Sequence, residues 1–285
     1  MQEAEYVYNI MCLTPITLYR NYSTMGGKKT NVVPCGKCPE CKRDRQNAWI
    51  FRLGQEQKHS NSAAFITLTY ENAPKSFNGH DTLCPKHLTN FWKRLRKQNN
   101  SSKTIRYYAV GEYGTKFLRP HYHAIAFNIN PNILQHHEKL QNIWSHGHVD
   151  IAKSEGASQR YTLGYIMQSN WEPTQDDDDR YPQFQRQSKN LGSGYLTPEI
   201  KNYYHSNKLP CITQAGGQIL KMPRYYKEKI FTKSERQKMA AEWQKHNALT
   251  WEQFQQHDYS LELQQKLNKY RQHEKTNREN KKLTF

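Results

Sequence analysis

Alternating apolar and polar positions in the middle of the chain predict a β-sheet. Four segments show this alternation: residues 63–70, 104–110, 122–128 and 148–151. The first is the clearest, because it combines β-branched and aromatic residues (Ala-Ala-Phe-Ile-Thr-Leu-Thr-Tyr) over eight positions. Gly111 and Gly114 lie between the second and third segments, so these two strands are expected to form a hairpin.

Apolar residues recur at helical spacing in four other segments. These are residues 43–59, 87–98, 133–144 and 160–169. Residues 87–98 give the sharpest pattern, with Leu88, Phe91, Trp92 and Leu95 on one face and basic residues elsewhere. The resulting order of strand, helix, hairpin, helix and strand predicts an α+β fold, an antiparallel sheet with flanking helices packed on one face.

The composition divides the chain into three predicted regions. Residues 1–60 form a loop-rich, cysteine-containing segment and a first helix, and residues 61–228 form the sheet domain. Residues 183–226 within it are expected to be rich in loops, because glycine is frequent there. Residues 229–285 are rich in Gln, Lys and Glu and predict a basic helical C-terminal extension, whose end is expected to be disordered.

The charge balance indicates a polyanionic partner. The chain holds 42 Lys and Arg against 25 Asp and Glu, a formal net charge of +17. Such an excess fits a phosphate backbone and exceeds what solubility requires. There is no apolar stretch of transmembrane length and no N-terminal pattern of a signal peptide, so we expect an intracellular protein with no membrane partner.

Three cysteines lie within seven residues, as Cys35-x-x-Cys38-x-x-Cys41. This spacing suits a structural zinc ion better than disulfide bridges in a protein of this charge. Cys12 is the preferred fourth ligand and His59 the second choice. Free thiols in a reducing cytosol are the alternative. Four protein ligands would leave no open position for chemistry, so such a zinc would be structural.

His121 and His123 are two residues apart, so in a strand both imidazoles point to one face. The expected hairpin brings Glu112 beside them. Two imidazoles and one carboxylate form a site for Mg²⁺ or Mn²⁺, which can act as a Lewis acid on a phosphodiester. Taken singly, the histidines could lie on a solvated strand face, and Glu112 could pair with Arg119 or Lys116.

Tyr161 and Tyr165 are four residues apart, so on a helix they share one face. A tyrosine oxygen is a competent nucleophile when a cation stabilises the developing charge. Core packing is the alternative for any such pair in a chain with 19 tyrosines.

Pro120-His121-Tyr122-His123 and the apolar run after it resemble the motif of the HUH endonucleases, named for two histidines around a bulky residue. The set of motifs resembles the replication initiation proteins of the microviruses, small single-stranded DNA bacteriophages. Six stretches match in order: residues 33–41, 65–70, 105–114, 119–125, 161–165 and 223–226. The resemblance covers roughly residues 10–230.

The resemblance implies a palm- or RRM-like HUH fold and an initiator of rolling-circle replication. The family nicks one DNA strand at the origin, keeps the 5′ end as a phosphotyrosine, and later rejoins the strand to release a circle. His121 and His123 match its metal ligands and Glu112 the third, acidic ligand. Tyr161 and Tyr165 match its tyrosines.

Two positions depart from the family pattern. Gly164 and Gln168 stand where the family often carries lysines near the tyrosines. The cation expected beside the nucleophile must then come from elsewhere, such as Lys153 or Arg160, or from the metal. We expect Tyr165 to be the principal nucleophile, with Tyr161 either a second nucleophile or a packing residue.

The implied partners are single-stranded DNA, origin duplex DNA, and the host helicase and DNA polymerase, in the cytoplasm of a bacterial host. The residues expected to contact DNA are Thr67, Thr69, Lys93, Arg94, Arg96, Lys97, Arg106 and Arg119. A plasmid or transposon HUH nuclease is one alternative. A zinc-stabilised nucleic-acid-binding protein without catalysis is another, and a covalent protein–DNA adduct would exclude it.

Overall fold

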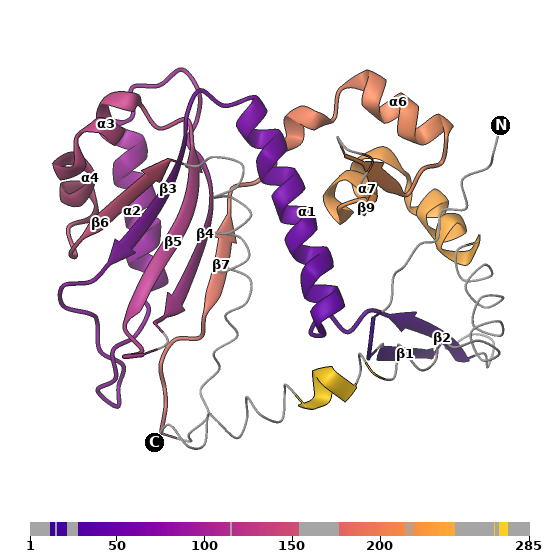
Figure 1. Ribbon diagram of the computed structural model, residues 1–285, viewed down its shortest axis with the longest axis horizontal. Coiled ribbons are helices and arrows are strands. Elements are labelled where there is room, and N and C mark those ends of the chain that lie inside the picture. Colours follow the sequence, from indigo (N-terminus) through magenta and orange to yellow (C-terminus); the bar gives the residue numbers. More distant parts are fainter. Residues whose placement is uncertain are drawn as a thin grey trace. The chain divides into compact units, whose positions relative to one another are not determined.

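Figure 1 shows a computed structural model of the chain, which forms two compact units. One unit is Ala48–Asn202; the other combines Met1–Asn47 with Tyr203–Phe285. The boundaries of these two units differ from those of the three domains predicted at residues 1–60, 61–228 and 229–285. The residues that the structure describes are 12–14, 16–21, 28–114, 116–153, 177–214, 217, 219–242, 265 and 268–272. Within these ranges, no helix has the length and apolar character needed to cross a membrane.

The unit Ala48–Asn202 is built on a five-stranded sheet in the order β6-β3-β5-β4-β7, with every neighbouring pair antiparallel. Its strands are β3 (Ala63–Thr69), β4 (Arg106–Tyr113), β5 (Pro120–Phe127), β6 (Val149–Lys153) and β7 (Phe184–Gln187). The predicted antiparallel α+β arrangement is confirmed, and β4 and β5 form the predicted hairpin. A single register therefore fixes which side chains of β3, β4 and β5 lie next to one another.

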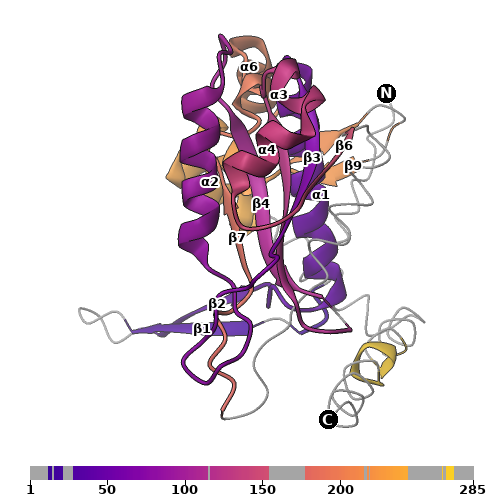
Figure 2. The same ribbon diagram turned by 90° about the vertical axis from the view of Figure 1, so that its left-hand side faces the viewer.

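One face of this sheet is covered by α2 (Pro85–Gln98) and α4 (His137–Trp144), as Figure 2 shows. Helix α2 buries the four apolar residues that its sequence pattern predicts, Leu88, Phe91, Trp92 and Leu95. These pack with alternate strand residues, among them Leu68, Tyr122 and Ala124, in one core cluster. Alternation along the strands thus supplies the buried face that the sequence predicts.

The helix predicted over residues 133–144 is interrupted. It is formed by α3 (Pro131–Gln135) and α4, separated by His136 with φ −108° and ψ 90°. His136 Nδ1 lies 2.7 Å from the carbonyl oxygen of Asn132. In a continuous helix the backbone N–H of His136 would bond to that carbonyl. The side chain occupies the acceptor instead, and the helix restarts one residue later.

The opposite sheet face is covered in part by α1 (Pro39–Lys58), which lies across the sheet from α2 in Figure 1. Trp49 and Leu53 of this helix pack with Tyr108, Ile125 and Phe127 in a second cluster. The expectation that the helices lie on one face was therefore wrong. Both faces of β4 and β5 carry apolar residues, so each face is buried by a helix.

The segment 183–226, predicted to be rich in loops, contains more regular structure than expected. It holds β7, the 3₁₀ turn η1 (Ser193–Tyr195), α6 (Pro198–Ser206), β8 (Cys211–Thr213), β9 (Ile219–Lys221) and the start of α7 (Arg224–Ile230). Strand β7 escaped prediction because it is a four-residue edge strand in which Phe184 is followed by polar residues. Gly111 pairs with Phe184, and a Cβ at Gly111 would approach its ring to 2.9 Å.

The second unit contains a hairpin of β1 (Ile16–Asn21) and β2 (Lys28–Val33), in a segment predicted to consist of loops. Ile16 and Leu18 are 48% and 46% exposed, so these two apolar residues of β1 are not part of a buried face. Residues 233–242 are helical, as predicted for the chain after Lys229, whereas α7 (Arg224–Ile230) lies almost wholly before that residue. The helix predicted over residues 160–169 lies outside the described residues.

Candidate functional site

The His-x-His pair lies on the face of the sheet that α1 leaves partly open. Alternation along β5 places His121 and His123 on the same face as Ile125 and Phe127, which pack in the cluster with Trp49 and Leu53 of α1. The strand face therefore changes from apolar beside α1 to polar at the β4–β5 turn.

The sheet register brings the third predicted ligand beside the pair. Glu112 on β4 is directly opposite His121, and Thr69 on β3 is opposite His121 on the other side. Thr67 is opposite His123 in the same way. Glu112 Oε1 lies 3.1 Å from His121 Nε2 and 3.4 Å from His123 Nε2. The three predicted ligands thus converge on one point.

Each of the two histidines is oriented by a hydrogen bond at Nδ1, the ring nitrogen that does not face Glu112. His121 Nδ1 donates to the carbonyl oxygen of Arg119 at 3.1 Å. His123 Nδ1 lies 3.0 Å from Thr67 Oγ1, and the ring of His123 stacks on Phe65 with centroids 5.4 Å apart. Each Nε2 is therefore the nitrogen that faces Glu112. This arrangement is the one by which outer residues commonly fix the orientation of a metal-binding imidazole.

Glu112 is 2% exposed, yet it is held in the charged form. Burial alone would raise its pKa, but hydrogen bonds from His121 and His123 lower the pKa to about 2. Burial would likewise lower the pKa of His121, and the bonds to Glu112 and to the Arg119 carbonyl raise it. Glu112 is therefore a buried, negatively charged carboxylate with two imidazole nitrogens beside it. A cation site requires this combination of negative charge and ligand atoms.

The donor set fits a divalent cation. One carboxylate and two imidazoles suit Mn²⁺ and Mg²⁺, and bonds of 2.0–2.2 Å in an octahedral site place neighbouring ligand atoms about 3 Å apart. The two Glu112–histidine distances, 3.1 and 3.4 Å, match that spacing. Within the described residues, this triad and a cysteine group are the clusters able to hold a metal ion.

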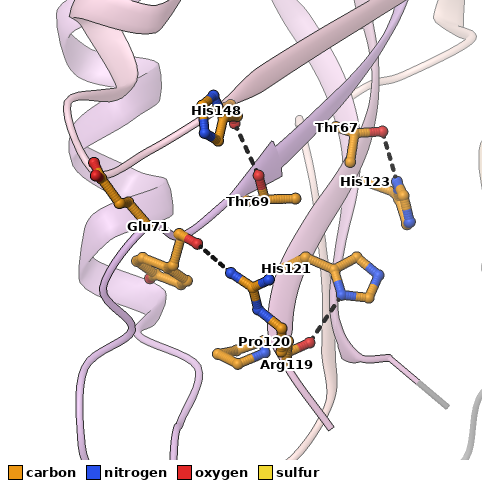
Figure 3. Close-up of a pocket in the computed structure, with 9 residues that line it drawn as sticks. Thr67, Thr69, Glu71, Arg119, Pro120, His121, His123 and His148 are labelled. Atoms are coloured by element: carbon orange, nitrogen blue, oxygen red, sulfur yellow. Dashed lines mark hydrogen bonds between the residues drawn. The ribbon is translucent and has the colours of Figure 1, made fainter. Parts of the chain in front are cut away.

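A pocket of about 520 Å³ opens beside the triad, and Figure 3 shows the residues that line it. They are Thr67, Thr69, Tyr70, Glu71, Arg119, Pro120, His121, His123 and His148. His148 was not among the predicted site residues. It enters the pocket because its carbonyl oxygen accepts the backbone N–H of Thr69 at 2.9 Å. The sequence His146-Gly147-His148 before a strand was the available signal.

Three of the residues predicted to contact DNA are held by backbone carbonyls or by a buried acid. Arg94 donates to the carbonyls of Ile143 and Trp144, at the C-terminal end of α4. Arg119 donates to the carbonyl of Tyr70 at 3.0 Å while lining the pocket. Arg106 lies 3.2 Å from buried Glu56. These contacts fix the arginines in place and account for much of their hydrogen-bonding capacity.

Thr67 and Thr69 lie in the pocket with one hydroxyl each directed at a neighbour. Thr67 contacts His123 as described, and Thr69 Oγ1 lies 3.4 Å from the carbonyl oxygen of His148. Lys93, Arg96 and Lys97 are exposed on α2, as predicted for a basic helix face. The structure thus separates the predicted DNA contacts into pocket residues, anchored arginines and open cations.

The predicted nucleophiles Tyr161 and Tyr165 lie outside the described residues. The structure therefore describes the metal-ligand part of the expected site. The chain enters this region directly after β6, whose partner β3 carries Thr67 and Thr69.

The four cysteines predicted as zinc ligands come together in the second unit. The sulfur atoms of Cys12, Cys35, Cys38 and Cys41 all lie within 4.8 Å of one another, whereas His59 is outside the group. Cys38 Sγ and Cys12 Sγ are 3.9 Å apart. Tetrahedral zinc with Zn–S bonds of 2.3 Å separates its sulfurs by about 3.8 Å. The choice of Cys12 over His59 agrees with this geometry.

The backbone of the cysteine turn favours the thiolate form of Cys35, whereas burial raises the pKa of the Cys12 and Cys41 thiols. Gly36 has φ +73°, a conformation suited to glycine, and the N–H groups of Lys37 and Cys38 each lie 3.3 Å from Cys35 Sγ. Burial would raise the pKa of the Cys35 thiol, but a bond from the Thr14 side chain and these two N–H groups lower it to about 6. Thiolate is the form that binds zinc.

One protein family model matches the segment of the chain that contains the triad of Glu112, His121 and His123. Residues 63–170 match the family model described as replication-associated protein ORF2. This range contains β3 to β6, the whole metal triad and both predicted tyrosines. No solved structure matches the chain.

Three phage proteins are similar over most of the chain. Replication-associated protein ORF2 of Spiroplasma virus 4 is 28% identical over 70% of this chain and 67% of its own length. Replication-associated protein ORF4 of Chlamydia phage 1 is 25% identical over 69% of this chain and 53% of its own length. Replication-associated protein VP4 of Bdellovibrio phage phiMH2K is 24% identical over 68% of this chain and 66% of its own length.

The alignments therefore span between about half and two thirds of each relative. Together with the family match, they confirm the resemblance drawn from the six motifs. Over most of its length the chain is similar to the replication-associated proteins of these phages.

Proposed function

We propose that this protein initiates rolling-circle replication by nicking one DNA strand at an origin with a tyrosine nucleophile. The observation that carries the proposal is the convergence of Glu112 Oε1 on His121 Nε2 and His123 Nε2, at 3.1 and 3.4 Å. The names of the relatives support a role in phage replication, and the net charge of +17 supports a nucleic-acid substrate.

Glu112, His121 and His123 would hold a divalent cation, Mg²⁺ or Mn²⁺. When bound, that cation supplies Lewis-acid chemistry at a non-bridging oxygen of the scissile phosphate. The protein's own contribution is to orient the ligands through Thr67 and the Arg119 carbonyl, and to offer Arg119 at the pocket rim for phosphate. A Zn²⁺ ion on Cys12, Cys35, Cys38 and Cys41 would be structural.

Tyr165 is the proposed principal nucleophile. Its phenolic oxygen forms a bond to phosphorus while the bond from phosphorus to the 3′ oxygen breaks, and the proton lost by the phenol balances the one gained by the 3′-OH. The free 3′-OH can prime a host polymerase. Since the phosphodiester is exchanged for a phosphotyrosine, the reverse reaction rejoins DNA without ATP, and Tyr161 could serve a second cut.

The test uses the full chain with Mn²⁺ and single-stranded oligonucleotides tiled across the genome that encodes it, each labelled at the 3′ end. A denaturing gel should show a labelled protein band, because the tyrosine keeps the 5′ end of the labelled fragment. Tyr165→Phe and His121→Ala should each lower its yield at least 100-fold. Tyr203→Phe, at an exposed tyrosine of α6, is the matched control and should keep wild-type yield.

An adduct that survives in part in Tyr165→Phe and disappears in the double Tyr161→Phe, Tyr165→Phe variant would show that both tyrosines react. If wild-type protein binds the oligonucleotides but forms neither adduct nor nick on any of them, the proposal is wrong. The zinc-stabilised DNA-binding protein is then the better description.

A further inference from the structure

A second pocket lies in a strongly basic part of the unit Ala48–Asn202. Residues 82–111 contain seven Lys and Arg and no Asp or Glu. Residues 180–198 contain three Lys and Arg and, again, no Asp or Glu. These two stretches supply α2, β7 and the part of β4 before Glu112, and β4 pairs with β7. Positive charge is therefore concentrated along this edge of the sheet without acidic neighbours from these stretches.

The pocket has a volume of about 370 Å³ and collects three of these cations. Arg96 comes from the last turn of α2, Arg106 from the first position of β4, and Lys189 from the segment after β7. The remaining lining residues are Thr104, Ile105, Tyr107 and Ser188. Among the described residues that line the pocket, none is acidic, whereas Thr104 and Ser188 add hydroxyl groups.

Two of the three cations, Arg106 and Arg96, are oriented by contacts within the protein. Arg106 is oriented by a carboxylate and a backbone carbonyl. Arg106 Nη1 lies 3.2 Å from Glu56 Oε2 and donates to the carbonyl of Asn190 at 2.9 Å. Glu56 is 6% exposed and also accepts the backbone N–H of Gly192, so its carboxylate is directed into the protein. The buried acid thus orients Arg106 without lining the pocket.

Arg96 is placed by an aromatic stack. Its guanidinium lies 5.5 Å from the ring centroid of Tyr107, and that ring stacks on Trp92 with centroids 4.0 Å apart and an interplanar angle of 4°. Trp92 is 1% exposed, so the stack rests on the core. A cation near an aromatic face is attracted by the negative charge on the face of the ring. The arginine is therefore pre-positioned at the pocket.

We propose that this pocket binds a phosphate group of a nucleic-acid backbone. Glu56 balances the charge of Arg106 from inside the protein, but no acidic residue in the lining balances Arg96 and Lys189. A phosphate anion would neutralise these two cations and accept bonds from the arginine and hydroxyl donors of the pocket. The shared chemistry is a phosphate ester, which a DNA backbone or a free nucleotide could supply. The repeated charge along this edge favours the backbone.

The position of the pocket gives it a role relative to the metal triad. Arg106 and Glu112 are six residues apart on β4, a span of about 20 Å at 3.3 Å per residue. The pocket and the triad therefore lie toward opposite ends of the same strand. About six nucleotides of one strand at duplex spacing cover that distance. That both sites hold the same DNA strand rests on the proposed function; phosphate binding itself does not.

The test measures binding of fluorescein-labelled dT20 to the full chain in EDTA, by anisotropy over a series of NaCl concentrations. The pocket variant is Arg96→Gln with Lys189→Gln. The matched control, Lys86→Gln with Lys139→Gln, removes the same charge from exposed positions of α2 and α4 that line neither pocket and are not among the predicted DNA contacts. Thermal melting of each variant establishes that it is folded.

We expect the pocket variant to raise the Kd at least 10-fold and to reduce the magnitude of the slope of log K against log salt by about 0.7, the contribution of one lost phosphate contact. The control should change the Kd less than 3-fold. Equal losses in the two variants, or no loss in either, would overturn the proposal, because binding would then depend on net charge alone.

A second arm, in which dTMP replaces dT20, distinguishes the two sources of phosphate. Tight dTMP binding that the pocket variant abolishes, with dT20 affinity unchanged, would identify a free-nucleotide site and contradict backbone binding. Because EDTA removes catalysis from both arms, a chain that forms no adduct but loses dT20 affinity in the pocket variant would refute the proposed function and support this inference.

Discussion

At the scale of the residue, the candidate metal site depends on how two imidazoles are turned. A strand places His121 and His123 on one face, but it does not choose which ring nitrogen points to Glu112. That choice is made by the carbonyl of Arg119 for His121 and by the hydroxyl of Thr67 for His123. Thr67, which the sequence suggested as a DNA contact, is therefore better described as a residue that positions a ligand.

Thr67→Val should weaken Mn²⁺ binding about 10-fold, because the valine has nearly the same volume but cannot bond His123 Nδ1. Thr67→Ser keeps the hydroxyl and should restore most of the affinity. Thr69→Val is the matched control, since the Thr69 hydroxyl is directed at the His148 carbonyl and not at a ligand. Electron paramagnetic resonance of free Mn²⁺ measures each Kd. Equal losses for Thr67→Val and Thr69→Val would exclude a specific positioning role.

At the scale of the element, Gly147 allows the backbone that leads into β6 to approach the end of β3 closely. The backbone around Gly147 runs beside the end of β3: the carbonyls of His146 and His148 accept the N–H groups of Glu71 and Thr69, each at 2.9 Å. Gly147 has φ +146°, and a Cβ there would lie 2.4 Å from the backbone nitrogen of Glu71. A residue with a side chain cannot occupy this position without moving the strand that carries Thr67 and Thr69.

Gly147→Ala should lower the free energy of unfolding by at least about 2 kcal/mol, since backbone atoms must move and the conformation is strained. Gly54→Ala provides a contrast within the same unit. Gly54 lies inside α1 with open space where a Cβ would project, so the alanine should raise stability by about 1 kcal/mol. Urea unfolding followed by tryptophan fluorescence measures both. Destabilisation by Gly54→Ala equal to that by Gly147→Ala would show that the close approach is not the cause.

At the scale of the whole molecule, the two donor sets belong to different compact units. Glu112, His121 and His123 lie in Ala48–Asn202, whereas the four cysteines lie in the unit that contains Met1–Asn47. The chemistry differs as well, because thiolates select zinc and the mixed carboxylate and imidazole set accepts Mn²⁺. Loss of one metal need not entail loss of the other.

Cys38→Ala should lower bound zinc from about one ion per chain to near zero, because a tetrahedral site loses one of four ligands, and should leave the Mn²⁺ Kd within about 3-fold. His121→Ala should have the reverse effect. Cys211→Ala, at a buried cysteine outside the cluster, is the control and should keep both metals. Elemental analysis and Mn²⁺ titration measure the two contents. Parallel loss of both metals in either variant would contradict independent sites.

The sequence predicted the elements whose pattern is local and strong. Helix α2, strand β3 and the β4–β5 hairpin follow from the spacing of their apolar residues and from Gly111 and Gly114. It did not predict β7, whose residues after Phe184 are polar, or the β1–β2 hairpin, whose Ile16 and Leu18 are exposed. These strands form because they pair with a neighbouring strand, so their own sequences show little alternation of apolar and polar residues.

By itself, the sequence determined the ligand types of both candidate metal sites. The spacings His-x-His and Cys-x-x-Cys-x-x-Cys are local, and strand periodicity fixes the face of the histidines. The predicted hairpin already put Glu112 beside the histidines, but only the tertiary structure decided the register that sets Glu112 opposite His121 and that Thr67 orients His123. It likewise decided that α1 covers the second sheet face and that Arg96, Arg106 and Lys189 share a pocket. These relations join distant residues through strand register and helix packing, which no local pattern encodes.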